Sequence, residues 1–219
     1  MRLLSPLEAR VLGVLIEKQH TVPDTYPLSL NALTAGCTQK TARSPVIEAI
    51  DAEVLSAVDG LKLMSLVFEG SGSRVVRYEH NLGRVLVAPA AAVALLAVLM
   101  LRGPQTAAEL RLNCERLHKF ADISSVEGFL DEMVERYPPR VVKLARAPGA
   151  REPRWAHLLC GDVAEPVFVA GLANEGAGPS VALGELAALR AEQTRLAAEV
   201  ADLRALVQRL ARDLGVEGV

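Results

Sequence analysis

The feature that most constrains the fold is a pattern that occurs twice along the chain. Each copy contains three helical stretches followed by two short, strand-like runs. Several positions match between the copies at one sequence offset: Leu33 and Cys37 match Leu110 and Cys114, and Tyr78-x-His80 matches Trp155-x-His157. Such self-similarity indicates a duplicated module. The alternative is chance similarity between two amphipathic stretches.

In the first copy, apolar residues at helical spacing predict a helix from the Ser5-Pro6 start to near Gln19. A short second helix is predicted over 28–37, and a third helix from Val46 onward. The buried face of the third helix is predicted to carry Ile50, Val54, Leu55, Val58 and Leu61. The runs LVFEG and RVVRYEH flank Ser71-Gly72-Ser73 and predict a β-hairpin.

The second copy opens with the apolar run VLVAPAAAVALLAVLML, from Val85 to Leu101. This run is shorter than the ~20 residues of a membrane-spanning helix, and Pro89 interrupts it, so we predict a strand end followed by a buried helix. Further helices are predicted over 107–114 and 125–137. Two strand-like runs around the Pro- and Gly-containing tip of RVVKLARAPGAREPRWAHL complete the copy.

Three helix starts share one sequence signature, a hydroxyl residue three positions before a glutamate. They are Ser5 with Glu8, Thr106 with Glu109, and Ser124 with Glu127. In such a capping box, each side chain accepts a hydrogen bond from a free backbone N–H of the first turn. We therefore predict helix N-termini at these three places.

Three helices and a hairpin form the winged-helix variant of the helix-turn-helix. The stretches LSPLEARVLGVLIEKQHTVPDTYPLSLNAL, LNALTAGCTQKTARSPV and LVFEGSGSRVVRYEHNL closely resemble the YceH family of uncharacterised bacterial proteins. The resemblance runs from about Leu4 to His157 and implies two tandem winged-helix domains, with no established activity. Where the family usually has Ser-Asn-Arg-Asp-Pro, this chain has Thr41-Ala42-Arg43-Ser44-Pro45, which keeps the Arg and Pro but loses two polar side chains.

We accordingly predict an α+β, mainly helical fold. Its parts are winged-helix domains at residues 1–85 and 86–170, a linker at 171–180 and a long C-terminal helix at 181–216.

The C-terminal segment repeats apolar residues at alternating intervals of three and four, which is a coiled-coil heptad pattern. Its seam comprises Leu186, Leu189, Gln193, Leu196, Val200, Leu203, Val207, Leu210 and Leu214. Leucine at every d position favours a parallel homodimer, and the polar Gln193 at an a position can fix its register. A helix that docks on its own chain is the alternative.

Basic side chains concentrate in the loops and wings, and acidic ones in the third helices. The candidate nucleic-acid contacts are Lys40, Arg43, Arg74, Arg77, Arg140, Lys143, Arg146, Arg151 and Arg154. The third helices read VIEAIDAEVLSAVDGLK and SVEGFLDEMVER, whose carboxylates would repel phosphates, so ordinary major-groove reading is disfavoured. The net charge of −2 gives no overall attraction to nucleic acid.

Two functions follow from these patterns. The first is a non-enzymatic, dimeric regulator that binds double-stranded DNA through basic loops and wings. The second is a protein-interaction scaffold similar in outline to segregation and condensation protein B, which uses the acidic third helices and the coiled coil.

The sequence offers no catalytic constellation, and we expect no cofactor. Three widely spaced cysteines without CxxC spacing indicate neither zinc nor a disulfide framework, and they favour the reducing cytoplasm. Cys114 and His118 have helical spacing but lack further ligands, so no metal site is predicted. His80 and His157 are predicted to be structural.

Overall fold

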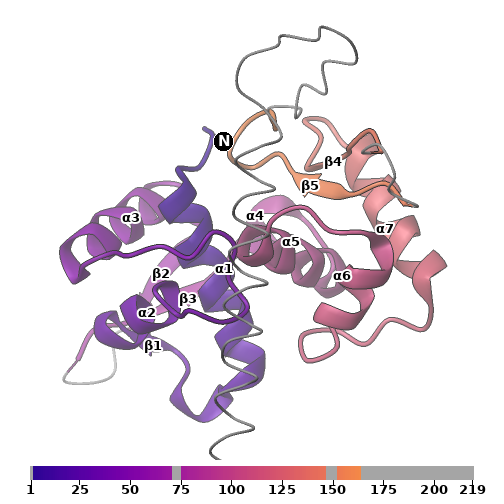
Figure 1. The fold of residues 1–219 in the computed structure, drawn as a ribbon. Helices are drawn as coiled ribbons and strands as arrows, with labels where there is room; N and C mark the ends of the chain where they lie inside the picture. The colour runs from indigo at the N-terminus through magenta and orange to yellow at the C-terminus, as the bar shows by residue number, and fades with distance from the viewer. Residues whose placement is uncertain (1, 71–74, 147–151, 164–219) are drawn as a thin grey trace, which may run out of the picture. The chain divides into compact units, whose positions relative to one another are not determined.

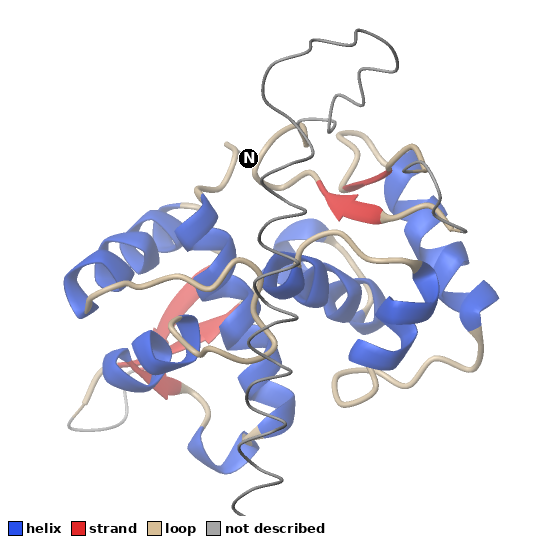
Figure 2. Ribbon diagram, in the orientation of Figure 1, coloured by secondary structure: helices blue, strands red, loops and turns tan. Residues whose placement is uncertain are grey.

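The computed structural model describes residues 2–70, 75–146 and 152–163. The chain divides into a compact unit over Met1–Val167 and a second unit over Phe168–Val219. The linker and the heptad helix predicted at 171–216 lie outside the described residues. Helices account for about half of the described residues and the sheets are small, so the protein is α+β and mainly helical, as predicted (Figure 2).

The first copy of the repeat contains three helices and a three-stranded antiparallel sheet (Figure 1). The helices are α1 (Pro6–Thr21), α2 (Leu30–Cys37) and α3 (Asp51–Leu63), with a 3-10 turn, η1 (Pro23–Thr25), after α1. The strands are β1 (Leu28–Ser29), β2 (Val67–Gly70) and β3 (Arg77–His80), and their order in the sheet is β1-β3-β2. The hairpin of β2 and β3 was predicted, and β1 was not.

The second copy follows a short connecting helix, α4 (Leu82–Leu86). Its helices are α5 (Ala90–Arg102), α6 (Ala107–Asn113) and α7 (Ile123–Glu135), and its hairpin pairs β4 (Val141–Lys143) with β5 (Trp155–His157). The strand end predicted before α5 is wrong, because α4 occupies that segment. The domain boundary predicted after residue 85 falls inside α4 and stays a prediction.

The two copies repeat one backbone register. In the first, Leu28 of β1 pairs with Tyr78 of β3; in the second, Gln105 pairs with Trp155 in an isolated antiparallel bridge. Gln105 and Trp155 lie at the same sequence offset from Leu28 and Tyr78 as the matched leucines and cysteines do. The same chain geometry therefore precedes the second helix of each copy.

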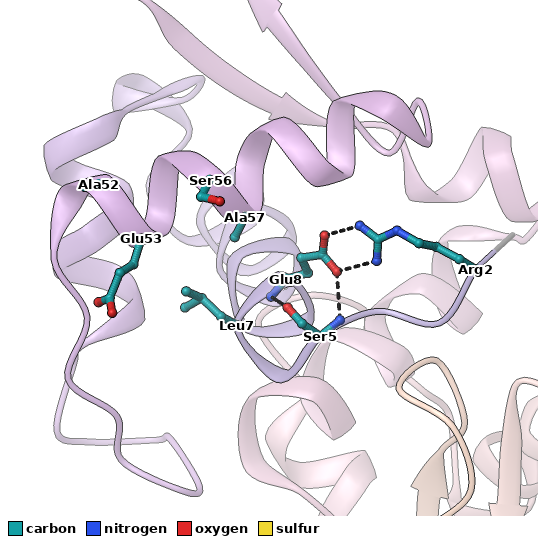
Figure 3. Close-up of a pocket in the computed structure, with 8 residues that line it drawn as sticks. All are labelled: Arg2, Ser5, Leu7, Glu8, Ala52, Glu53, Ser56 and Ala57. Carbon is teal, nitrogen blue, oxygen red and sulfur yellow. Dashed lines mark hydrogen bonds and ion pairs between the residues drawn. The ribbon is translucent and has the colours of Figure 1, made fainter.

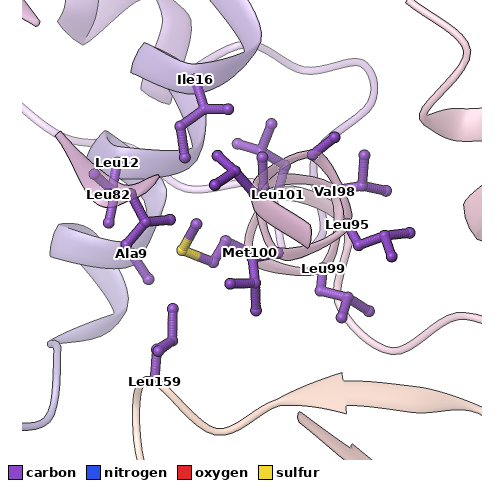
Figure 4. Packing of buried hydrophobic residues seen from close by; sticks show 14 of the residues in the cluster. Ala9, Leu12, Ile16, Leu82, Leu95, Val98, Leu99, Met100, Leu101 and Leu159 are labelled. Atoms are coloured by element: carbon purple, nitrogen blue, oxygen red, sulfur yellow. The ribbon is translucent and has the colours of Figure 1, made fainter. Parts of the chain in front are cut away.

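The central helices α1 and α5 hold the two copies together. Residues 8–16 of α1 and 91–101 of α5 are all buried, so each helix is covered on every side. Their mutual contact is the most extensive between any two described elements. Figure 4 shows Met100 and Leu101 of α5 facing Ala9, Leu12 and Ile16 of α1.

Two backbone hydrogen bonds also join the copies. The N–H of Ser44, in the loop after α2, donates to the carbonyl of Leu101 at 2.8 Å. The N–H of Leu4 donates to the carbonyl of Leu159, also at 2.8 Å. The loop before α3 and the N-terminal segment are thus both anchored to the second copy.

Two of the three predicted capping boxes are confirmed. Ser5 with Glu8 and Thr106 with Glu109 exchange both capping hydrogen bonds at the starts of α1 and α6. The third was placed wrongly, because α7 is capped by Asp122, whose carboxylate accepts a hydrogen bond from the Ser125 N–H at 2.7 Å. A carboxylate caps a helix as well as a hydroxyl does, so the earlier Asp122 competes successfully with Ser124.

The third helix of the first copy begins later than predicted. Residues 46–50 are not helical, and α3 begins at Asp51, where the Glu53 carboxylate accepts a hydrogen bond from the Ile50 N–H at 3.0 Å. Val46, Ile50 and Leu55, which share the helical apolar spacing, are exposed. Val54, Val58 and Leu61 are buried as predicted, so the predicted apolar face is confirmed at these three positions and wrong at Ile50 and Leu55.

Two helical glycines provide a test of how tightly this core is packed. A Cβ on Gly36 of α2 would lie 2.6 Å from Cγ1 of Val14, whereas one on Gly128 of α7 would have no heavy atom within 4 Å. We expect Gly36→Ala to destabilise the protein by about 1–3 kcal/mol through overpacking. Gly128→Ala should stabilise it by about 0.5–1 kcal/mol through helix propensity. Urea unfolding measures both changes, and equal effects would contradict this packing of α1 against α2.

Candidate interaction surfaces

Arg43, a predicted phosphate contact, is instead part of the interior. Its side chain is fully buried, and its guanidinium forms a two-pronged ion pair with Glu17 of α1, at 2.6 Å and 3.1 Å. Its Nε donates to the carbonyl of Gly36 at 3.2 Å. Arg43 therefore fixes the loop after α2 and contributes nothing to the exposed surface.

Arg77 and Arg154 hold equivalent places in the two copies. Arg77 donates to the carbonyl of Pro27 at 2.7 Å, and Arg154 donates to that of Pro104 at 2.8 Å. Arg154 also pairs with Glu109 at 3.1 Å. Each arginine thus joins the last strand of its hairpin to the segment before the second helix, which gives both a structural role.

The other predicted nucleic-acid contacts that lie in the described residues make fewer contacts within the protein. Lys143 lies over the ring of Trp155, with Nζ 5.0 Å from the ring centroid. Arg140 is half-buried, and burial followed by the nearby Arg136 charge lowers its pKa. Lys40 and Arg146 are exposed. Arg74 and Arg151 lie outside the described residues, as do the predicted dimerisation residues from Leu186 to Leu214.

Acidic side chains dominate the exposed parts of both third helices. We define the α3 acidic face as Glu48, in the segment before α3, together with Asp51 and Glu53 of its first turn. We define the α7 acidic face as Asp131, Glu132 and Glu135; all six residues are exposed. Asp59, also exposed, is neutralised by Lys62 at 3.5 Å.

The carboxylates of the α7 acidic face are unfavourable for the stability of α7 itself. Glu132 and Glu135 occupy the last turn, where the helix dipole is negative and a basic residue is normally favoured. The last turn of α7 holds no basic residue, whereas those of α1, α3 and α6 each hold at least one. Asp131 and Glu135 are also like charges at i, i+4, which destabilises a helix. Folding of α7 does not account for these carboxylates.

Of the cysteines and histidines singled out in the repeat, Cys37 and Cys114 are buried, and His80 and His157 are half-buried. Burial raises the pKa of both Cys37 and Cys114 to about 12, so neither is a reactive thiolate. Burial lowers the pKa of His157 to about 4, and burial with a smaller effect of His20 lowers that of His80 to about 4. Within the described residues, no three His, Cys, Asp or Glu side chains gather as metal ligands do.

Two hollows border the start of α1. One, of about 560 Å³, lies between the start of α1 and the first turns of α3 and is lined by Leu7, Glu53 and Ser56 among others (Figure 3). At its edge Glu8 is held by Arg2 and by the Ser5 N–H, and the Arg2 hydrogen bond keeps the pKa of Glu8 below its usual value. The second, of about 460 Å³, is lined by residues of α1, the 44–49 segment, α5 and β5.

Sequence reasoning missed these hollows and the inner residues that shape them. Arg10 of α1 is buried and donates to the carbonyls of Cys37 and Pro45, at 3.2 Å and 2.6 Å. A charged residue within an otherwise apolar helix pattern is a signal that could have indicated a buried side chain that holds another segment by hydrogen bonds. Its partners could not have been found, because they are backbone carbonyls distant in sequence.

Comparison with known proteins places this α+β protein in a family. The family described as "Protein of unknown function, DUF480" matches residues 4–150. The chain is 68% identical over 217 residues to a UPF0502 protein of Burkholderia multivorans, covering 99% of this chain and 92% of that relative. It is 68% identical over 214 residues to a UPF0502 protein of Leptothrix cholodnii, covering 97% and 96%. The chain therefore belongs to this bacterial family, and the resemblance to an uncharacterised bacterial family is confirmed.

None of the helices that the structure describes has the length and apolar character needed to span a bilayer. The apolar helix α5 instead fills the core beside α1.

The Arg43–Glu17 pair provides a test of the structural role of Arg43. Glu17→Gln leaves the buried guanidinium without a carboxylate, which should lower the free energy of unfolding by about 3 kcal/mol. The double variant Glu17→Leu/Arg43→Met removes both charges and should cost less than the single change. Urea unfolding of the two variants decides this, and a harmless Glu17→Gln change would contradict the pair.

The two half-buried histidines, His80 and His157, predict a loss of stability in mild acid. Their pKa values of about 4 in the fold lie below the ~6.5 of an unfolded chain, so the unfolded state binds more protons between these values. Stability from this source is complete above pH ~6.5 and falls as the pH drops towards 4, by about 2 kcal/mol per histidine at pH 5.

Unfolding free energies measured in urea between neutral pH and pH ~5 test this linkage. His157→Phe serves as the comparison. Because it removes one of the two titrating histidines, the free energy of unfolding should fall less between neutral pH and pH ~5, by the contribution of one histidine. A variant that declines as steeply as the parent would contradict the assignment.

Proposed function

We propose that this protein is a non-enzymatic interaction module, made of two tandem winged-helix domains, that binds protein partners through its acidic third helices. The winged-helix assignment is supported by the shared register of the copies. Each copy places a short extended segment before its second helix and pairs it with the last strand of the hairpin. The β1-β3-β2 order and a hairpin that follows the third helix are typical of this fold.

The observation that carries the proposal is the exposed charge of α3 and α7. A DNA-reading helix presents Arg, Lys, Asn or Gln to base edges. These helices instead expose carboxylates, and the α7 acidic face persists against its own helix dipole. A local rule broken without structural compensation is typical of a functional site. Carboxylates in this position suit a basic protein partner.

Binding of double-stranded DNA is the second candidate function. Its support is the exposure of Lys40 and Arg146 and the position of Lys143 on the second hairpin. Its support is reduced by the arginines at 43, 77 and 154, whose guanidiniums already serve internal contacts. Contacts to the backbone phosphates by the remaining side chains would be tolerant of sequence and steeply dependent on salt.

The heptad pattern at the C-terminus extends the proposal to a cytoplasmic homodimer. A parallel dimer would present two copies of each acidic face to a partner, which raises the apparent affinity through avidity.

A charge-reversal experiment tests the proposed function. The double variant Asp131→Lys/Glu135→Lys reverses the α7 acidic face, and Asp24→Lys/Glu115→Lys gives the same change in net charge at exposed acids elsewhere. We expect proteins that co-purify with the parent and with the control to be lost from the α7 variant. Partners retained by all three proteins would contradict a role for this face.

Fluorescence anisotropy with random-sequence duplex DNA separates the second candidate. We expect no salt-sensitive binding by the full-length protein at low salt. Tight binding that falls with salt and with Lys143→Ala/Arg146→Ala would favour the DNA function instead.

A further inference from the structure

The two hollows beside the start of α1 are neighbours that share part of their lining. Both are lined by Leu7 and Glu53, so the two hollows lie next to each other at these residues. Figure 3 shows Leu7 between the N-terminal turns of α1 and α3, with Glu53 on one side and Arg2 on the other. We call the combined feature the α1–α3 groove.

The groove has apolar walls and a polar rim. Its interior walls are formed by Leu7, Ala57, Ile47, Leu99 and Met100. Its arginines are already engaged, because Arg2 pairs with Glu8 and Arg10 donates to two backbone carbonyls. Glu48 and Glu53 are exposed on the rim. Because Arg2 is paired with Glu8 and the Arg10 side chain is buried, the charge that the rim exposes is negative.

One wall of the groove is a length of extended chain. Exposure alternates along residues 46–50, with Val46, Glu48 and Ile50 outward and Ile47 and Ala49 inward, as in a strand. Among the described residues, no backbone group accepts or donates a hydrogen bond to the peptide groups of residues 46–49. Such a segment presents free N–H and C=O groups to which a further extended chain can pair.

We propose that the α1–α3 groove binds an extended, basic segment of a partner protein. Backbone pairing with residues 46–49 holds the segment, its aliphatic side chains enter the two hollows, and its Lys or Arg side chains meet Glu48 and Glu53. This assignment rests on the proposed interaction function and specifies how the α3 acidic face and the hollows beside it would hold a partner of stated chemistry.

The test is selection of random peptides displayed on phage against the full-length protein. The most enriched peptide is then synthesised with a fluorophore as the probe. We expect enriched sequences to combine Lys or Arg with Val, Ile or Leu. In fluorescence anisotropy, Glu48→Lys should weaken binding of the probe several-fold, because it replaces an attracting rim charge with a repelling one. Ser56→Trp, which fills the groove from an exposed position of α3, should abolish binding.

Asp131→Lys on α7 is the matched control and should bind the probe as the parent does. Methyl-labelled methionine provides a second readout, because the chain has four methionines and Met100 lines the groove while Met133 of α7 does not. The probe should shift the Met100 resonance and leave that of Met133 unchanged.

Two results would overturn the assignment. One is a failure to enrich basic peptides; the other is a probe that binds Glu48→Lys and Ser56→Trp as tightly as the parent. If only Asp131→Lys abolished binding of the probe, the binding site would be the α7 acidic face. That result would reject the groove assignment and would leave the proposed function standing.

Discussion

The packing of α1 against α5 is the constraint on which the rest of the described structure depends. Each is the first helix of its copy, and each is buried on all sides because its own copy covers one face and the other helix covers the opposite face. Fully burying one leucine side chain contributes about 1.5–3 kcal/mol, so neither helix would be stable with that face open to water. The copies are therefore halves of one core, whatever their origin as repeated modules.

This shared core determines the course of the loop between α2 and α3. Arg10 and Arg43 both donate to carbonyls in the last turn of α2, the negative end of that helix dipole. Arg10 also holds the carbonyl of Pro45, and the Ser44 N–H reaches Leu101 of α5. With the chain fixed at these points, residues 46–50 run along the surface to the start of α3. The extended wall of the groove is thus a consequence of how the two copies are joined.

Sequence patterns predicted the elements where local rules decide them. The helices α1 and α2, the capping boxes at Ser5 and Thr106, and both hairpins follow from periodicity and cap chemistry. The start of α3 did not, because Val46 and Ile50 have helical apolar spacing while distant tethers hold their segment extended. The role of Arg43 depends on Glu17, which is remote in sequence. Counting charges cannot tell a guanidinium that faces water from one that meets a buried carboxylate.

That difference bears directly on function. Basic and acidic residues nearly balance over the whole chain, which by itself gives no preference for nucleic acid or protein. In the fold, Arg10, Arg43 and Arg77 donate to carbonyls or to Glu17, whereas the carboxylates of the α3 and α7 acidic faces remain exposed. Because only exposed charge attracts a partner, a nearly neutral chain presents acidic third helices to solvent. Exposed carboxylates of this kind repel phosphates and attract basic groups, which is why the proposed partner is a basic protein segment.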